Sequence, residues 1–186
     1  MVSVGGPWVM LLGALVAAAG CGLAATLVRR RLGARTAWAA AGLVWWLLVI
    51  ALVTLLPASG PPGLVPASEA QTACSFDLGG PAPDGFWIVG GGQRTLNTAL
   101  FVPAGLLLVL LVGRPRTWWL ALPGVALLAA YSVGIEWTQL VLARLDRACD
   151  VTDVVDNVTG ALLGAGVGAL VAAVLAAGEA VGRRRR

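Results

Sequence analysis

Carboxylates, amides and guanidinium groups recur beside the long apolar stretches of this sequence. Glu136 and Gln139 share one face of a predicted helix with Ser132, because residues three and four apart are neighbours on a helix. The predicted ligand-binding residues are Arg94, Asn97, Glu136, Gln139, Arg147, Asp150, Asp153 and Asn157. Guanidinium groups bind phosphate or carboxylate, and amides add adaptable hydrogen bonds, so this set could bind the polar head of an amphiphile.

Ordinary structural roles are the alternative explanation for part of this set. Glu136 could extend into the outer head groups, or pair with an arginine that locks two helices together. Asp153 suits the N-cap of the helix that follows it, and the helix dipole favours acidic side chains in that first turn. Capping does not explain Arg147 or Asn157.

The residue types that are missing exclude several kinds of site. The chain has no His, so His-based triads and His metal sites are ruled out. All 13 basic residues are Arg, which excludes Schiff-base and Walker-type lysine chemistry. We therefore expect no cofactor and no bound metal, and we favour a binding protein over an enzyme.

Apolar residues dominate the elements that must position this chemistry. The 186 residues are 59% hydrophobic and 12% charged, with a mean hydropathy of +0.87, whereas soluble domains carry about 25% charged residues. Five stretches are long enough to cross a membrane: Trp8–Val28, Thr36–Leu56, Leu96–Val112, Thr117–Leu140 and Val158–Ala177. The sequence therefore predicts an all-α, polytopic membrane protein, a bundle of five transmembrane helices.

The arginines divide unevenly between the two sides of this bundle. Ten of the 13 fall in the 29–35 and 113–116 loops and the 183–186 tail, which the positive-inside rule makes cytoplasmic. We expect a multi-pass protein of the bacterial cell membrane with its N-terminus outside and its C-terminus cytoplasmic. The pI near 9.8 then reflects topology and contact with anionic lipid rather than nucleic acid.

Four segments follow from this topology. They are two N-terminal transmembrane helices (1–56), an extracytoplasmic loop (57–93), a three-helix motif region (94–178) and a basic cytoplasmic tail (179–186). Cys74 and Cys149 both fall on the outer, oxidising side, so we predict a disulfide between them; two separate free thiols are the alternative. The loop could act as a lid or as a simple linker.

One pocket near the outer membrane boundary is the central prediction about the site. Its expected members are Glu136, Arg147, Asp153, Asn97, Gln139 and Asn157. Arg147 is the expected partner of Glu136 or Asp153, because its planar fork can serve two carboxylates. Below Asn157, a Gly160-x3-Gly164-x3-Gly168 seam would let another helix approach closely.

The order of these residues resembles the VanZ-like family of bacterial membrane proteins. The resemblance covers roughly 94–168 and rests on Asn97-x3-Phe101-x-Pro103-x-Gly105, Glu136-x2-Gln139, and Arg147-x2-Asp150-x2-Asp153-x3-Asn157-x2-Gly160-x3-Gly164. Ala148 and Cys149 depart from the small polar or aromatic pair that the family leads us to expect. The resemblance implies a cell-envelope protein associated with resistance to teicoplanin-type glycopeptide antibiotics.

Three functions remain open on the sequence. The first is an envelope protein that binds or moves an amphiphile at the outer leaflet, such as a lipid-linked precursor or a glycopeptide antibiotic. The second is a membrane hydrolase or transferase acting on a polyprenyl or lipid phosphate, with Glu136 as acid or base and a divalent metal at Asp150 and Asp153. The third is a helical scaffold. The expected partners are the lipid bilayer and, under the first function, the lipid-linked precursor or the glycopeptide antibiotic. No nucleic acid is expected, and the sequence sets no oligomeric state.

Overall fold

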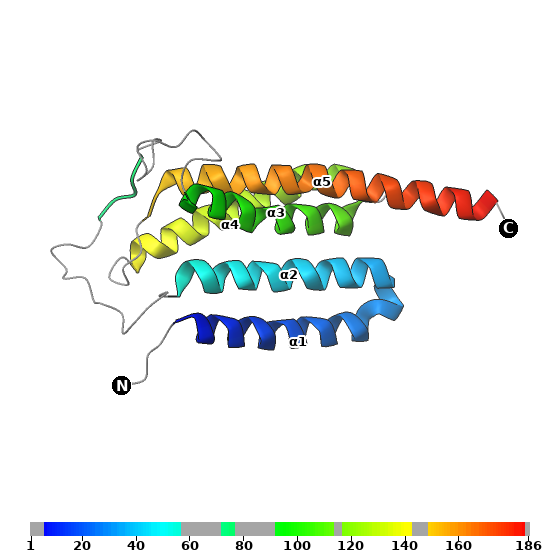
Figure 1. Ribbon diagram of the computed structural model, residues 1–186, viewed down its shortest axis with the longest axis horizontal. Coiled ribbons are helices and arrows are strands. Elements are labelled where there is room, and N and C mark those ends of the chain that lie inside the picture. The colour runs from blue at the N-terminus through cyan, green and yellow to red at the C-terminus, as the bar shows by residue number, and fades with distance from the viewer. Residues whose placement is uncertain (1–5, 57–71, 77–91, 114–116, 143–148, 185–186) are drawn as a thin grey trace.

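Five α-helices make up most of the chain (Figure 1). The computed structural model describes residues 6–56, 72–76, 92–113, 117–142 and 149–184. The helices are α1 (Pro7–Leu32), α2 (Ala34–Leu55), α3 (Gly92–Val112), α4 (Ala121–Val141) and α5 (Val151–Arg184), with a 3-10 turn, η1 (Trp118–Leu120), before α4. Each of the five is long and apolar enough to cross a membrane. The predicted all-α bundle of five transmembrane helices is confirmed.

Helix α5 begins at Val151, seven residues before the predicted membrane-crossing stretch that starts at Val158, because Asp150 caps it. The Asp150 Oδ1 accepts the Thr152 N–H at 2.8 Å, which satisfies one of the free donors of the first turn. The prediction that Asp153 is the N-cap was wrong: Asp153 lies inside the first turn, where its charge suits the helix dipole. Hydropathy alone misses this polar first section of the helix.

Two other helices also differ at their starts. Helix α3 begins at Gly92 instead of Leu96, so Arg94 lies within the helix rather than ahead of it. Helix α4 begins at Ala121 instead of Thr117, and Pro123 stands in its first turn, where a missing N–H costs nothing. Between α1 and α2, Gly33 alone makes the connection with a φ of 85°, a conformation that suits glycine.

The buried core lies among α2, α3, α4 and α5. Phe101, Ile50 and Ala161 are fully buried there, and Leu108, Leu128 and Ile135 pack with them. Two indole groups and a phenol add directional contacts between helices. Trp45 donates to the Ala14 carbonyl at 2.9 Å, Trp46 donates to the Leu100 carbonyl at 2.7 Å, and Tyr131 donates to the Leu47 carbonyl at 2.6 Å.

Helices α3 and α5 run side by side in the same direction with one constant register. A Cβ added at Gly160 would fall on the Thr98 carbonyl oxygen, and one added at Gly164 would fall on the Val102 carbonyl oxygen. The predicted glycine seam therefore exists, and it brings α5 backbone directly against α3 backbone. The same register, a separation of 62 in sequence, pairs Arg94 with Asp156 one turn above Thr98 and Gly160.

The two ends of the bundle differ in chemistry. We call the end where α2 and α4 finish and α3 and α5 start the polar end, and the opposite end, where α1 meets α2, the arginine end (Figure 1). Exposed tryptophans, which favour membrane interfaces, mark both levels: Trp8 and Trp137 near the polar end, Trp38 and Trp119 near the arginine end. Trp119 and Trp137 are about 27 Å apart at 1.5 Å per residue, close to the thickness of a hydrocarbon core.

Candidate functional site

Buried polar side chains gather at the polar end. Within the described part of the chain, the buried polar and charged residues are Thr98, Ser132, Glu136, Gln139, Thr152, Asp156 and Asn157. All of them lie in the first two turns of α3 or α5, or in the last three turns of α4. Three helices thus deliver polar groups to one level of the bundle, as the sequence predicts, and this level is next to the Trp137 boundary.

The strongest single interaction here joins α3 to α5. Arg94 Nε donates to Asp156 Oδ2 and Arg94 Nη2 donates to Asp156 Oδ1, both at 2.9 Å. The side chains are only 12% and 4% exposed. This two-pronged geometry is the strong form of an Arg–carboxylate pair. The pair uses the Nε–Nη2 edge of the Arg94 guanidinium, so Arg94 serves mainly to hold the two helices together.

Glu136 is buried and fixes the start of α5. Its Oε2 accepts the backbone N–H of Asp150 at 2.9 Å, while the Asp150 side chain caps the helix. The predicted partner of Glu136, Arg147, lies outside the described residues, so that pairing stays a prediction. Asp150 and Asp153 interact electrostatically with both Arg94 and Glu136, which places all four charges in one neighbourhood.

Two amide side chains form the lower layer of the cluster. Asn157 Nδ2 donates to Ser132 Oγ at 2.9 Å in a fully buried contact between α5 and α4. Gln139 Nε2 donates to the Thr54 carbonyl at 3.1 Å, which ties α4 to the end of α2. In each amide, therefore, the NH2 group donates a hydrogen bond to the protein, and the oxygen accepts none from the described residues.

Four buried polar atoms of this cluster have no hydrogen-bond partner among the described residues: Asn97 Nδ2, Thr98 Oγ1, Gln139 Oε1 and Asn157 Oδ1. An unpaired buried polar group costs about 1–3 kcal/mol, so native structures rarely leave one, and four at a single level is unusual. They comprise one amide donor, two amide acceptors and a hydroxyl that can do either. Such a set matches a ligand that carries both hydroxyl or N–H donors and oxygen acceptors.

A segment of the loop between α2 and α3 is bonded to the residues at the start of α5. Cys74 and Cys149 form the predicted disulfide, with their Cα atoms 4.7 Å apart. Ser75 adds two backbone hydrogen bonds, from its N–H to the Cys149 carbonyl and from the Val151 N–H to its own carbonyl, each 3.0 Å. The rest of the 57–91 loop, apart from residues 72–76, lies outside the described residues.

The structure brings most of the predicted site residues to one level, but in specific pairs rather than as one open pocket. Arg94, Asn97, Glu136, Gln139, Asp150 and Asn157 all belong to the polar end. Asp156 and Ser132 were not among the predicted ligand-binding residues, yet they are the partners of Arg94 and Asn157. A signal for Asp156 exists in the sequence: it precedes Gly160 by one helical turn, so it shares the face that packs on α3.

Comparison with known proteins supplies the family. A family model described as VanZ/LLP1 matches residues 43–172, which run from α2 into α5 and make up more than half of the chain. The match extends the resemblance seen at 94–168 back to the second helix, and α1 lies outside it. No curated protein and no solved structure matches the chain. The chain therefore belongs to the VanZ/LLP1 family of membrane proteins.

Proposed function

We propose that this protein binds an amphiphilic ligand of the cell envelope at the outer leaflet and thereby alters susceptibility to teicoplanin-type glycopeptide antibiotics. The ligand's head group would lie at the polar end, among the ends of α3, α4 and α5. The candidates are a lipid-linked envelope precursor or the antibiotic itself.

The observation that carries this proposal is the set of unpartnered polar atoms at the polar end. The pairs formed by Arg94 with Asp156 and by Asn157 with Ser132 would suit a purely structural scaffold equally well. A scaffold gains nothing, however, from leaving Asn157 Oδ1 and Gln139 Oε1 buried and unpaired. A ligand that pairs with these oxygens offsets their cost only when it is bound.

The charges and unpartnered atoms at the polar end restrict which chemical groups the ligand's head group can carry. Because Arg94 is engaged with Asp156 through two hydrogen bonds, it is poorly placed to bind a phosphate as well. The carboxylates of Asp150 and Asp153 also act electrostatically on Arg94, and they disfavour a further anion there. The amide atoms instead favour hydroxyl and amide groups, as a sugar or a short peptide carries.

Orientation is part of the proposal. Exposed Arg29, Arg30, Arg31 and Arg35 lie where α1 meets α2, and α5 reaches its C-terminus at the same end of the bundle (Figure 1). The positive-inside rule then faces the arginine end to the cytoplasm and the polar end outward. The outer side is also where a disulfide persists, which supports this orientation. A reporter enzyme that works only in the cytoplasm should therefore be active when it is fused at Gly33.

Mass spectrometry of lipids retained by the gently purified protein tests the proposal. We expect a hydroxyl- or amide-bearing amphiphile to co-purify with the wild type and to be lost from Asn157→Ala. Thr159→Ala is the matched control, because its hydroxyl only bonds the Val155 carbonyl within α5, at 2.8 Å and exposed. Equal retention by all three proteins would contradict the proposal, and turnover of a polyprenyl phosphate would favour a hydrolase or transferase.

A further inference from the structure

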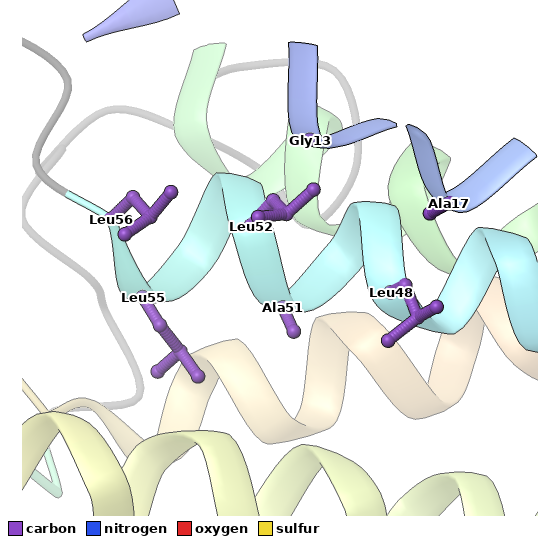
Figure 2. A pocket seen from close by; sticks show the side chains of 7 residues that line it. All are labelled: Gly13, Ala17, Leu48, Ala51, Leu52, Leu55 and Leu56. Atoms are coloured by element: carbon purple, nitrogen blue, oxygen red, sulfur yellow. The ribbon is translucent and has the colours of Figure 1, made fainter. Parts of the chain in front are cut away.

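An apolar groove lies between α1 and α2 at the polar end (Figure 2). It encloses about 280 Å³ and is lined by Gly13, Ala17, Leu48, Ala51, Leu52, Leu55 and Leu56. Figure 2 shows Gly13 and Ala17 of α1 across from the row of α2 residues. Every side chain of this lining is hydrocarbon.

The position of the groove restricts what can fill it. Its lining residues all lie in or at the end of the membrane-crossing helices α1 and α2, so it faces hydrocarbon rather than water. An apolar cavity of this kind stays dry, because water needs polar partners there. Among the described elements α1 packs on α2 alone, so no other helix covers the groove. A lipid chain is therefore the natural occupant.

The groove and the polar end share the last turn of α2. Leu56, the C-cap of α2, and Leu55 form its outer limit. The Thr54 carbonyl, one residue away, accepts the hydrogen bond from Gln139, whose Oε1 is one of the unpartnered buried atoms. A molecule whose head group reaches Gln139 would therefore have an apolar hollow for its tail beside the same turn of α2.

We propose that this groove holds the acyl chain of the amphiphile whose head group the polar end binds. This inference rests on the proposed function and assigns its tail-binding part to the groove between α1 and α2, of which only the α1 side lies outside the family match. Bilayer lipid is as apolar as the groove, so the groove adds little affinity by itself. Anchoring of the head group raises the local concentration of the attached chain, and the groove then selects for molecules that carry one.

Photocrosslinking in native membranes tests the inference. Cells expressing the protein are fed a fatty acid that carries a diazirine in its chain, irradiated, and the labelled peptides are mapped by mass spectrometry. We expect label on the peptide holding Leu48–Leu56 to exceed that on the exposed α5 leucines, Leu162 and Leu163. Uniform labelling of the two peptides would overturn the inference.

A matched pair of substitutions on α1 sharpens the result. Ala17→Leu fills the groove, while Ala24→Leu, two turns along, fills a second apolar hollow of about 200 Å³ toward the arginine end. Ala17→Leu should lower the crosslinking yield on the peptide holding Leu48–Leu56 about threefold or more, because a chain in the groove is held there by van der Waals contact alone. Ala24→Leu should leave that yield unchanged. If neither substitution lowers the label, or if both lower it equally, the groove does not hold the acyl chain.

The Asn157→Ala variant separates this inference from the proposed function. If both hold, Asn157→Ala lowers the groove label as Ala17→Leu does, because the tail is held through the head group. If the label falls only with Ala17→Leu, the groove binds ordinary bilayer lipid, and the link to a head group at the polar end is wrong. If Asn157→Ala loses the co-purified amphiphile while Ala17→Leu changes no label, the head-group site stands and the groove does not.

Discussion

The close contact between α3 and α5 predicts that a single added methyl group lowers the stability of the protein. Substituting Gly164 by Ala places a Cβ on the Val102 carbonyl oxygen and 3.0 Å from the Leu106 backbone nitrogen. Both obstacles are backbone, so neither can rotate away, and the two helices must move apart. Overpacking of this kind costs about 1–3 kcal/mol and occasionally more.

Gly166 provides the matched control in the same helix. A Cβ added there meets nothing within 4 Å. Replacing a glycine by alanine in a helix gains up to about 1 kcal/mol through backbone entropy, and that gain applies to both variants. We therefore expect Gly166→Ala to be neutral or slightly stabilising, and Gly164→Ala to lower the free energy of unfolding by about 2 kcal/mol.

Reversible unfolding in mixed micelles, followed by circular dichroism, measures this difference. A wider α3–α5 separation should also weaken the Arg94–Asp156 pair two helical turns away, so the effect should extend to the polar end. Equal stabilities for Gly164→Ala and Gly166→Ala would refute the close backbone packing described here.

Three further predictions concern the contacts at the polar end. Arg94→Met or Asp156→Leu alone should lower the free energy of unfolding by about 3 kcal/mol, because each leaves a buried charge unpaired, and the double variant should recover most of it; additive losses in a double-mutant cycle would contradict the pairing. Cys149→Ser should free Cys74 for alkylation from outside the cell and destabilise the protein by about 2–4 kcal/mol; an unchanged melting temperature would argue against the fastened loop segment. Glu136→Gln should have the melting temperature of the wild type, because its amide oxygen can still accept the Asp150 N–H, but it should lose the effect on glycopeptide susceptibility. Glu136→Leu should lower the free energy of unfolding by about 1–3 kcal/mol. Glycopeptide susceptibility that is unchanged in Glu136→Gln would limit Glu136 to a structural role.

Much of this fold follows from hydropathy. Five apolar runs predict five helices, and the glycines of α5 predict a close helix contact, because only glycine lets two backbones meet. The ends of the helices are less predictable. Asp150 caps α5 eight residues before the apolar run begins at Val158, and a window that averages hydropathy cannot detect one side chain accepting one N–H.

The pairing of site residues was harder to predict than their level. The sequence places Arg94 at the right depth, but its partner follows from the register of α3 against α5, which depends on tertiary packing. Thr54 illustrates a second limit of prediction from sequence, since its backbone carbonyl, rather than its side chain, accepts the hydrogen bond from Gln139. Any residue type could offer that carbonyl, so no pattern of residue types reveals it.

An experimental structure of the protein in a lipid nanodisc, prepared from native membranes without detergent exchange, would show whether the polar end holds a ligand. We expect non-protein density at the polar end, within hydrogen-bond distance of Asn157 Oδ1 and Gln139 Oε1. Density confined to bulk lipid, with both oxygens paired to N–H groups of the protein itself, would contradict it.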